Sequence, residues 1–346
     1  MADITFNGAS YSCIREMLEA RERLILSPFA SFASESKGRD REEPRCDIRT
    51  DYQRDRDRIL HSKSFRRMKR KTQVFLAPEG DHYRTRLTHT LEVSQIARTI
   101  SKALLLNEDL TEAIALGHDL GHTPFGHSGE AVLDKLCSEG FEHSEQSVRI
   151  VEVLEKGGKG LNLTVETRDG ILNHQTSGHP STLEGQVVRL SDKIAYLNHD
   201  VDDAIRGGLI TEADIPREYT DVLGNNVHDR LNSLIHDVIN HSMGRSEIVM
   251  SPDHQAAMQG LRHWMFGNIY TGGKAKAEEH KAQKMIELLF EYYMKHPDAM
   301  TSEYRMLMDN GTSRERAVCD YISGMTDNYA IEKFEELFVP LGWRVS

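Results

Sequence analysis

Histidine and aspartate side chains gather in the first half of the chain in a pattern suited to binding a divalent metal ion. Six of the 17 histidines fall between residues 82 and 143, and the adjacent pair His118–Asp119 lies within GHDLGHTPFGHSGE (117–130). A divalent ion needs neutral imidazoles and ionised carboxylates, held rigidly by helices that already pack together. We expect two nitrogens and at least two oxygens from His89, His118, Asp119 and Asp192.

Each of these residues lies on or beside a segment with helical periodicity. Apolar residues recur on one stripe from Val93 to Leu104, and His89 stands one turn earlier on the same stripe. Asn107 is suited to cap a second helix that runs through DLTEAIALGHDL. Residues 185–206 predict a third helix, whose apolar stripe lies opposite a polar face containing Asp192. Taken singly, each residue also suits a hydrogen-bonded core histidine or an exposed carboxylate.

The remainder of the chain also favours helices. Nine prolines in 346 residues leave long stretches of good helix formers, and further helices are predicted at 276–295 and 314–338. Polar or glycine-rich segments at 34–50 and 156–170 predict loops, with a short hairpin as an option within 161–168. We predict an all-α protein with an N-terminal helix and arm (1–50) and one large domain (51–346).

Composition excludes several classes of protein. A hydrophobic share of 38% is too high for a disordered chain, and no apolar run is long enough to span a membrane. The first residues lack the basic start and apolar run of a secretory signal. The four cysteines lie far apart with no C-x-x-C pair, which indicates a reducing cytoplasm and argues against a cysteine-based zinc site.

Charge is distributed unevenly along the chain. The net charge of −11 argues against a general polyanion binder, yet Lys and Arg outnumber Asp and Glu within residues 38–71. This basic strip is suited to meeting phosphates. A solvated basic face or a contact between subunits explains it equally well.

The order His89, His118–Asp119, Asp192 resembles the H…HD…D signature of the HD-domain metal-dependent phosphohydrolases. The resemblance is closest to the deoxynucleoside triphosphate triphosphohydrolases, the dGTPase-like branch. It covers most of the chain, from about residue 52 to 339, and Ser191 replaces the small alanine expected before the metal aspartate. The segments that carry it are SFRRMKRKTQVF (64–75), TRLTHTLEV (85–93), GHDLGHTPFGHSGE (117–130), FEHSEQS (141–147), LEGQVVRLSDKIAYLNHDVDDAI (183–205) and DYISGMTDNYA (320–330).

The resemblance implies hydrolysis of a deoxynucleoside triphosphate (dNTP) to the deoxynucleoside and inorganic tripolyphosphate. Water activated by a divalent metal would attack the α-phosphorus. The mixed nitrogen and oxygen ligands suit Mn²⁺, Mg²⁺, Fe, Co, Ni or Zn, and the residues do not select among them.

The resemblance also implies roles for nine residues around the metal. His127 and Glu130 would form an acid–base pair, with His122 and His143 as phosphate ligands or proton donors. Substrate would be bound at the α-phosphate by Arg86, at the phosphates and sugar by Lys193 and Tyr196, and at the 3′-hydroxyl by Asp200 and Gln73.

Two alternatives stay open. One is an HD phosphohydrolase of another nucleotide, such as a monophosphate, a cyclic nucleotide or an alarmone. The other is a nucleotide or single-stranded DNA (ssDNA) sensor that uses the 38–71 strip to bind the strand. The resemblance further implies a homo-oligomer, a tetramer or hexamer. The basic strip would also suit an activating dNTP at a subunit interface, and the absence of a long apolar run predicts no membrane partner.

Overall fold

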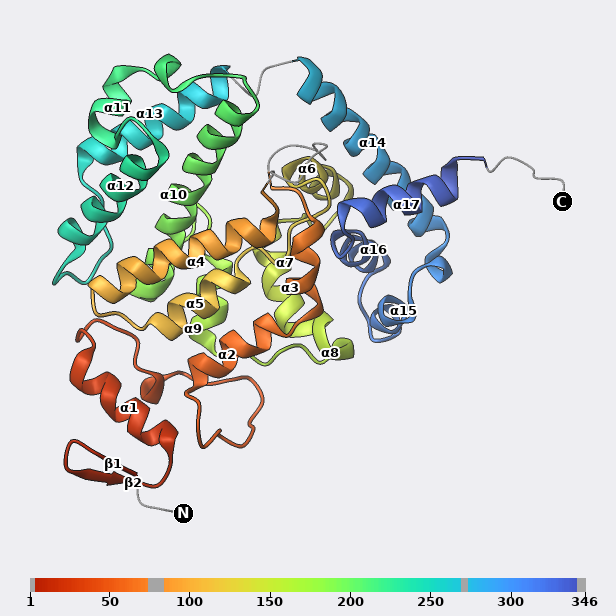
Figure 1. Ribbon diagram of the computed structural model, residues 1–346. Helices are drawn as coiled ribbons and strands as arrows, with labels where there is room; N and C mark the ends of the chain where they lie inside the picture. The colour runs from red at the N-terminus through yellow and green to blue at the C-terminus, as the bar shows by residue number, and fades with distance from the viewer. Residues whose placement is uncertain (1–3, 74–83, 269–272, 341–346) are drawn as a thin grey trace, which may run out of the picture.

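The computed structural model describes residues 4–73, 84–268 and 273–340 (Figure 1). The described residues are mostly helical and contain one small two-stranded sheet, which confirms the predicted all-α class. The first half of the chain forms β1 (Ile4–Phe6), β2 (Ala9–Tyr11), α1 (Ile14–Ile25), α2 (Asp51–Leu60), α3 (Lys63–Arg67), α4 (Arg86–Ala103), α5 (Glu108–Gly117), α6 (His127–Leu136), α7 (His143–Arg149), α8 (Glu155–Gly158) and α9 (Val165–Leu172). The second half forms α10 (Leu183–Arg206), α11 (Arg217–Leu223), α12 (Val227–Ser242), α13 (Pro252–Asn268), α14 (Gly273–Lys295), α15 (Ser302–Asp309), α16 (Arg314–Ser323) and α17 (Asp327–Phe338).

Three helices, α4, α5 and α10, pack against one another at the centre of the molecule (Figure 1). Each begins at a side chain that accepts a hydrogen bond from the first helical turn: Thr85 for α4, Asn107 for α5 and Thr182 for α10. Their apolar stripes are buried in one shared core, where Val93 of α4 and Val187 of α10 have no exposed surface. The three helices predicted around the candidate ligands are therefore confirmed.

Two further groups of helices flank this centre. Helices α11, α12 and α13 cover one end of α10, and α6 packs with α14, α16 and α17 around a separate apolar cluster (Figure 1). The candidate site lies between the central helices and both flanking groups, because α4, the turn after α5, α6, α10 and α13 all contribute residues to it.

The N-terminal residues form an arm that ends in the β1–β2 hairpin. The hairpin turns at Asn7 and Gly8, which have φ values of 49° and 79°. Glu184 on α10 anchors the arm by accepting hydrogen bonds from the Ser31 backbone and hydroxyl at 2.9 Å. Thr50 caps α2, which begins at Asp51. The division into units 1–50 and 51–346 stays a prediction.

Three expectations about local structure are wrong. The segment 314–338 forms two helices, because Gly324 ends α16 and Thr326 caps α17. Residues 156–170 are not all loop, since Thr164 caps a helix that starts at Val165. The hairpin considered within 161–168 is absent for the same reason; the described residues place the sheet at 4–11 instead. The predicted helix 276–295 is confirmed as part of α14.

Gly121 allows α7 to approach the turn after α5 closely. A Cβ atom added there would lie 2.3 Å from both His143 O and Ser147 N. Those atoms are backbone and cannot move aside cheaply. The same contact holds the start of α7, and with it His143, near His118, because Ser147 hydrogen-bonds to both the Gly121 backbone and the His118 carbonyl.

We predict that Gly121→Ala lowers the free energy of unfolding by about 1–3 kcal/mol, because the added methyl group overpacks this contact. Thermal and urea unfolding followed by circular dichroism would measure the loss. Gly267→Ala is the matched control, since Gly267 lies on α13 with nothing within 4 Å of an added Cβ. Equal stability of the two variants would contradict the predicted contact.

Candidate active site

The four candidate metal ligands converge at the junction of α4, the end of α5 and α10. Asp192 Oδ1 lies 3.0 Å from His89 Nε2 and 3.8 Å from His118 Nε2. Asp119 approaches the same two imidazoles, at 4.0 Å from His89 Nε2 and 3.5 Å from His118 Nε2. Both carboxylates of the predicted set therefore lie within 4.0 Å of both imidazoles.

The histidine orientations fit a metal ion. His118 Nδ1 donates a hydrogen bond to the Ala115 carbonyl at 2.6 Å, which leaves Nε2 as the bare nitrogen. That Nε2 is buried and has no hydrogen-bond partner among the described residues. A buried polar atom without a partner is costly unless something binds it. Together with two carboxylates, it makes a donor set suited to a transition metal or Mg²⁺.

Several neighbouring side chains stabilise the negative charge of the buried Asp119 carboxylate. Burial alone would raise its pKa, but His118, His122 and the Arg86 guanidinium together hold the pKa well below its usual value. Arg86 Nη1 donates to Asp119 Oδ2 at 2.9 Å, and both side chains are almost fully buried. Asp119 is therefore ionised and available as a ligand, and Arg86 is held at the edge of the metal cluster.

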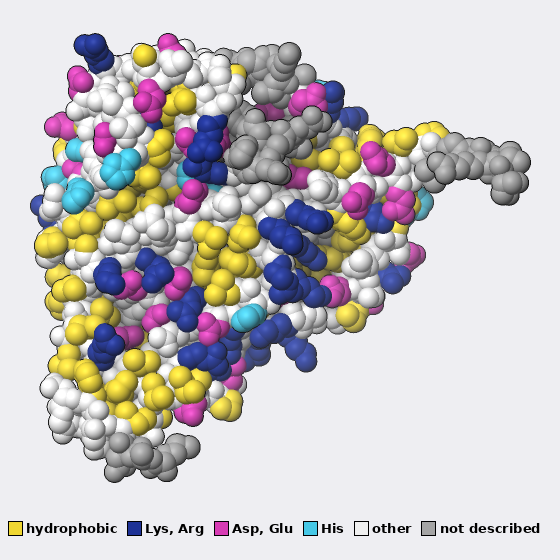
Figure 2. Space-filling view, in the orientation of Figure 1, with side chains coloured by type: hydrophobic (Ala, Val, Ile, Leu, Met, Phe, Trp, Pro, Cys, Tyr) yellow, Lys and Arg dark blue, Asp and Glu magenta, His cyan; other side chains and the backbone are white. Residues whose placement is uncertain are grey.

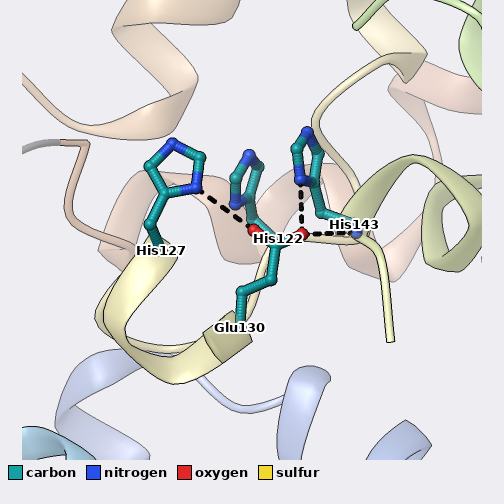
Figure 3. A group of neighbouring side chains, drawn as sticks. All are labelled: His122, His127, Glu130 and His143. Atoms are coloured by element: carbon teal, nitrogen blue, oxygen red, sulfur yellow. Dashed lines mark hydrogen bonds and ion pairs between the residues drawn. The ribbon is translucent and has the colours of Figure 1, made fainter. Parts of the chain in front are cut away.

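A second cluster lies beside the first and contains His122, His127, Glu130 and His143. Figure 3 shows the three imidazoles side by side with the Glu130 carboxylate bridging two of them. Glu130 lies 3.2 Å from His127 Nδ1 and 2.8 Å from His143 Nδ1. The His122 and His143 rings stack at 3.8 Å between centroids. Helix α6 begins at His127, so His127 and Glu130 lie one turn apart on the same face of its first turn.

The charges in this second cluster suit proton transfer. Burial would raise the pKa of Glu130, but hydrogen bonds from His127 and His143 hold it well below its usual value. Burial, with added repulsion from Arg86 and His143, lowers the pKa of His122 far below its usual value. An ionised carboxylate between two imidazoles stabilises whichever one takes up a proton.

A cavity of about 1100 Å³ opens over both clusters. The substrate residues expected from the sequence all line it: Gln73, Arg86, Lys193, Tyr196 and Asp200. Lys193 and Tyr196 project from α10, one and four residues beyond Asp192. His118 and Glu130 lie behind the cavity wall. The thirteen predicted site residues are thus brought together, and their individual roles stay predictions.

Some lining residues were missed by the sequence analysis. His174, just after α9, is buried and lies 3.2 Å from His143 Nε2; burial lowers its pKa to about 4. Its Nδ1 donates to the Ile171 carbonyl at 2.7 Å. The far wall of the cavity comes from α13 and the segment before it, including Met258, Arg262 and Phe266. No spacing in the sequence links these residues to the histidine motif.

The C-terminal helices hold two loops of the site in place. Lys71 is fully buried and donates hydrogen bonds to the carbonyls of His122 and Ser323, and burial lowers its pKa to about 7. Asp327, at the start of α17, accepts from Thr72 N at 2.9 Å and Phe125 N at 3.1 Å. The structure therefore ties the segment before α4 and the turn before α6 to α16 and α17.

The basic strip 38–71 is only partly a surface feature. Arg39 pairs with the buried Asp55, and Arg56 pairs with Asp109 at 3.1 Å. Figure 2 shows Lys and Arg side chains gathered over the region of α2 and α3. The exposed cations near α3 are Lys63, Arg66, Lys69 and Arg70. His82 and the last two residues of the 64–75 segment lie outside the described residues.

Comparison with known proteins identifies the family. Residues 86–197 match the HD domain, and residues 248–336 match the phosphohydrolase-associated domain. A deoxyguanosinetriphosphate triphosphohydrolase-like protein of Caldanaerobacter subterraneus subsp. tengcongensis is 60% identical over 330 residues, covering 95% of this chain and 97% of the relative. The chain belongs to the dGTPase-like family of HD-domain proteins.

Other relatives agree with this family. A deoxyguanosinetriphosphate triphosphohydrolase-like protein of Desulfatibacillum aliphaticivorans is 49% identical, covering 94% of this chain and 98% of the relative. The crystal structure of a phosphohydrolase from Bacteroides thetaiotaomicron VPI-5482 shares the fold, with a TM-score of 0.52 at 17% identity, over 81% of this chain and 67% of that one. As a dGTPase-like family member, the chain is a metal-binding hydrolase. None of its described helices has the length and apolar character needed to cross a bilayer.

We predict that Asp192→Ala lowers the bound metal at least tenfold and leaves the helical content unchanged. Asp192 contacts His89 and His118 but has no arginine partner among the described residues. Its loss therefore leaves no buried arginine without a counter-charge, and the fold should be retained. Metal analysis of dialysed protein and circular dichroism would measure the two effects. Asp221→Ala, an exposed aspartate on α11, is the control. Full metal content in Asp192→Ala would show that Asp192 is not a metal ligand.

Proposed function

We propose that this protein hydrolyses dNTPs to the deoxynucleoside and inorganic tripolyphosphate. The observation that carries the proposal is one cavity lined by three of the four metal donors, His89, Asp119 and Asp192, and also by Arg86 and the two histidines bound to Glu130. Its volume of about 1100 Å³ leaves room for a nucleotide. The names of the relatives support the same reaction, since they are described as deoxyguanosinetriphosphate triphosphohydrolase-like.

The metal site would stabilise charge on the phosphates. A divalent ion held by His89, His118, Asp119 and Asp192 would act as a Lewis acid on the phosphate oxygens and lower the pKa of a bound water. Arg86 would add its planar guanidinium to the α-phosphate while it keeps its pairing with Asp119. Mn²⁺, Fe, Co, Ni and Zn suit this mixed nitrogen and oxygen donor set, whereas Mg²⁺ would depend on the two carboxylates and water.

His127 and Glu130 would handle the protons of the reaction. The His127 side chain is exposed at the rim of the cavity, and Glu130 keeps its imidazole oriented. A proton taken from the attacking water would reside on His127, stabilised by the Glu130 carboxylate. His122 and His143, stacked in the cavity wall, would contact the phosphates or protonate the departing 5′ oxygen.

The α10 face would bind the sugar. Lys193 would reach the phosphates, Tyr196 would lie against the deoxyribose, and Asp200 with Gln73 would accept and donate hydrogen bonds at the 3′-hydroxyl. A side-chain ring against C2′ leaves little room for a 2′-hydroxyl, which would favour deoxyribose.

We also propose a cytoplasmic homo-oligomer, a tetramer or hexamer, with an activating dNTP between subunits. The four cysteines are free thiols, as a reducing compartment would keep them. The exposed cations Lys63, Arg66, Lys69 and Arg70 are the part of the basic strip suited to ssDNA or to a nucleotide phosphate. A sensor without catalysis, or a hydrolase of another nucleotide, remains the alternative that the following assay addresses.

We expect purified protein with Mn²⁺ to convert at least one dNTP to deoxynucleoside and tripolyphosphate. Each dNTP would be incubated alone and in mixtures, with products separated by anion exchange. Faster turnover in a mixture would support an activating nucleotide. Release of orthophosphate or pyrophosphate would overturn the proposed reaction, as would hydrolysis confined to monophosphates, cyclic nucleotides or alarmones.

We predict that His127→Ala keeps its metal and slows turnover by roughly a hundredfold, the usual contribution of an acid–base group. Steady-state rates would be compared with metal content in the same preparations. His263→Ala replaces an exposed histidine on α13 and serves as the control. An unaltered rate in His127→Ala would transfer the proton-handling role to His122 or His143.

A further inference from the structure

A chain of polar side chains continues outward from His89, on the side away from the metal cluster. His89 Nδ1 lies 3.2 Å from His199 Nδ1, and His199 Nε2 lies 2.7 Å from Glu92 Oε2. We infer that His199 and Glu92 are positioning residues for the metal centre: they fix the tautomer and orientation of His89 and thereby raise the affinity of the site for its metal. This inference rests on the metal centre of the proposed function and is independent of which nucleotide is hydrolysed.

The hydrogen positions along this chain follow from the chemistry of each group. If His89 binds a metal through Nε2, its single proton resides on Nδ1 and must be donated outward. The hydrogen-bond partner of His89 Nδ1 is His199 Nδ1, which then has to be the acceptor. The proton of His199 consequently resides on Nε2 and is donated to Glu92, an acceptor-only carboxylate. Every donor therefore meets one acceptor.

The two metal histidines are held in different ways. His118 Nδ1 donates to a backbone carbonyl, that of Ala115, which no side-chain substitution removes. His89 depends instead on side chains from two helices, because Glu92 belongs to α4 and His199 to α10. The orientation of His89 is thus coupled to the packing of α4 against α10, whereas that of His118 is not.

The outer end of the chain is anchored by charge. Arg84 Nε lies 3.2 Å from Glu92 Oε2, and Arg84 Nη1 lies 2.8 Å from carboxylate oxygens of Asp202 and Asp203. His199 itself is almost fully buried, with a side-chain exposure of 7%. A buried imidazole with both nitrogens engaged in this way has one orientation available. Bound carboxylates and backbone carbonyls behind metal-binding histidines have the same orienting effect in other proteins.

The test measures metal binding in the full-length chain, stripped of metal by chelation. Mn²⁺ would be titrated into wild type, His199→Leu, His199→Asn and Glu92→Gln, with free Mn²⁺ followed by electron paramagnetic resonance. We expect His199→Leu, which removes the acceptor, to weaken Mn²⁺ binding by about 10- to 100-fold. His199→Asn places an amide oxygen near the position of Nδ1 and should recover most of the affinity. Glu92→Gln should weaken binding less than His199→Leu, because an amide oxygen still accepts from Nε2.

A matched control separates this effect from the loss of any hydrogen-bonded histidine. His254 bonds to Ser233 and Ser251 at 2.9 and 3.0 Å, far along the chain from the ligands. His254→Asn should leave Mn²⁺ affinity unchanged while lowering the melting temperature as much as the His199 variants do. Equal Mn²⁺ affinity in wild type and His199→Leu would overturn the inference, since a merely structural role changes the melting temperature alone.

Tautomers give a second readout that needs no activity. In the Zn²⁺-loaded protein, ¹⁵N spectra of the histidines should show His89 protonated on Nδ1 and His199 on Nε2, assigned by comparison with His199→Asn. A His199 proton on Nδ1 would overturn the inference. Wild type that binds Mn²⁺ tightly and responds to His199→Leu, yet hydrolyses no dNTP, would uphold the inference and reject the proposed reaction. Wild type that binds neither ion would reject the metal centre and this inference together.

Discussion

The candidate active site depends on burying the carboxylate of Asp119. A carboxylate removed from water is stable only when hydrogen bonds and opposite charge replace its hydration. Arg86 supplies that charge at 2.9 Å, and His122 Nε2 approaches from the other side at 3.1 Å. His118 and His89 complete the surroundings. Because these partners come from α4, α5 and the turn after α5, the helices that meet there have to pack in one arrangement.

The positions of the candidate ligands could be predicted best where the residues also mark the periodicity or the end of a helix. His89 continues the apolar stripe of α4, and its position on the helix follows from the 3.6-residue period. Asn107 marks the start of α5 through its side-chain cap, which places the ligand pair at the helix end. The family resemblance joined these local signals to Asp192, more than seventy residues further along. The fold class and the convergence of the ligands could therefore be predicted together.

The missed features depend on contacts that no local pattern encodes. His174 follows a short helix and reaches His143 only because α7 and α9 pack together. The α13 wall of the cavity is distant in sequence from every motif. Lys71 belongs to the basic strip 38–71 in the sequence, but folding buries it. The hairpin at Asn7–Gly8 is a different case, because Asn-Gly is a strong local turn signal that the sequence itself contains.

The attachment of the site to α16 and α17 also bears on the order in which the protein matures during synthesis. The ligands are complete once α10 has been made, but Ser323 and Asp327, which hold Lys71, Thr72 and Phe125, are translated near the end of the chain. A nascent chain still attached to the ribosome before these residues emerge has its ligands without the contacts that fix the loops around them. The loops around the candidate ligands are therefore fixed in place only after the last two helices have been made.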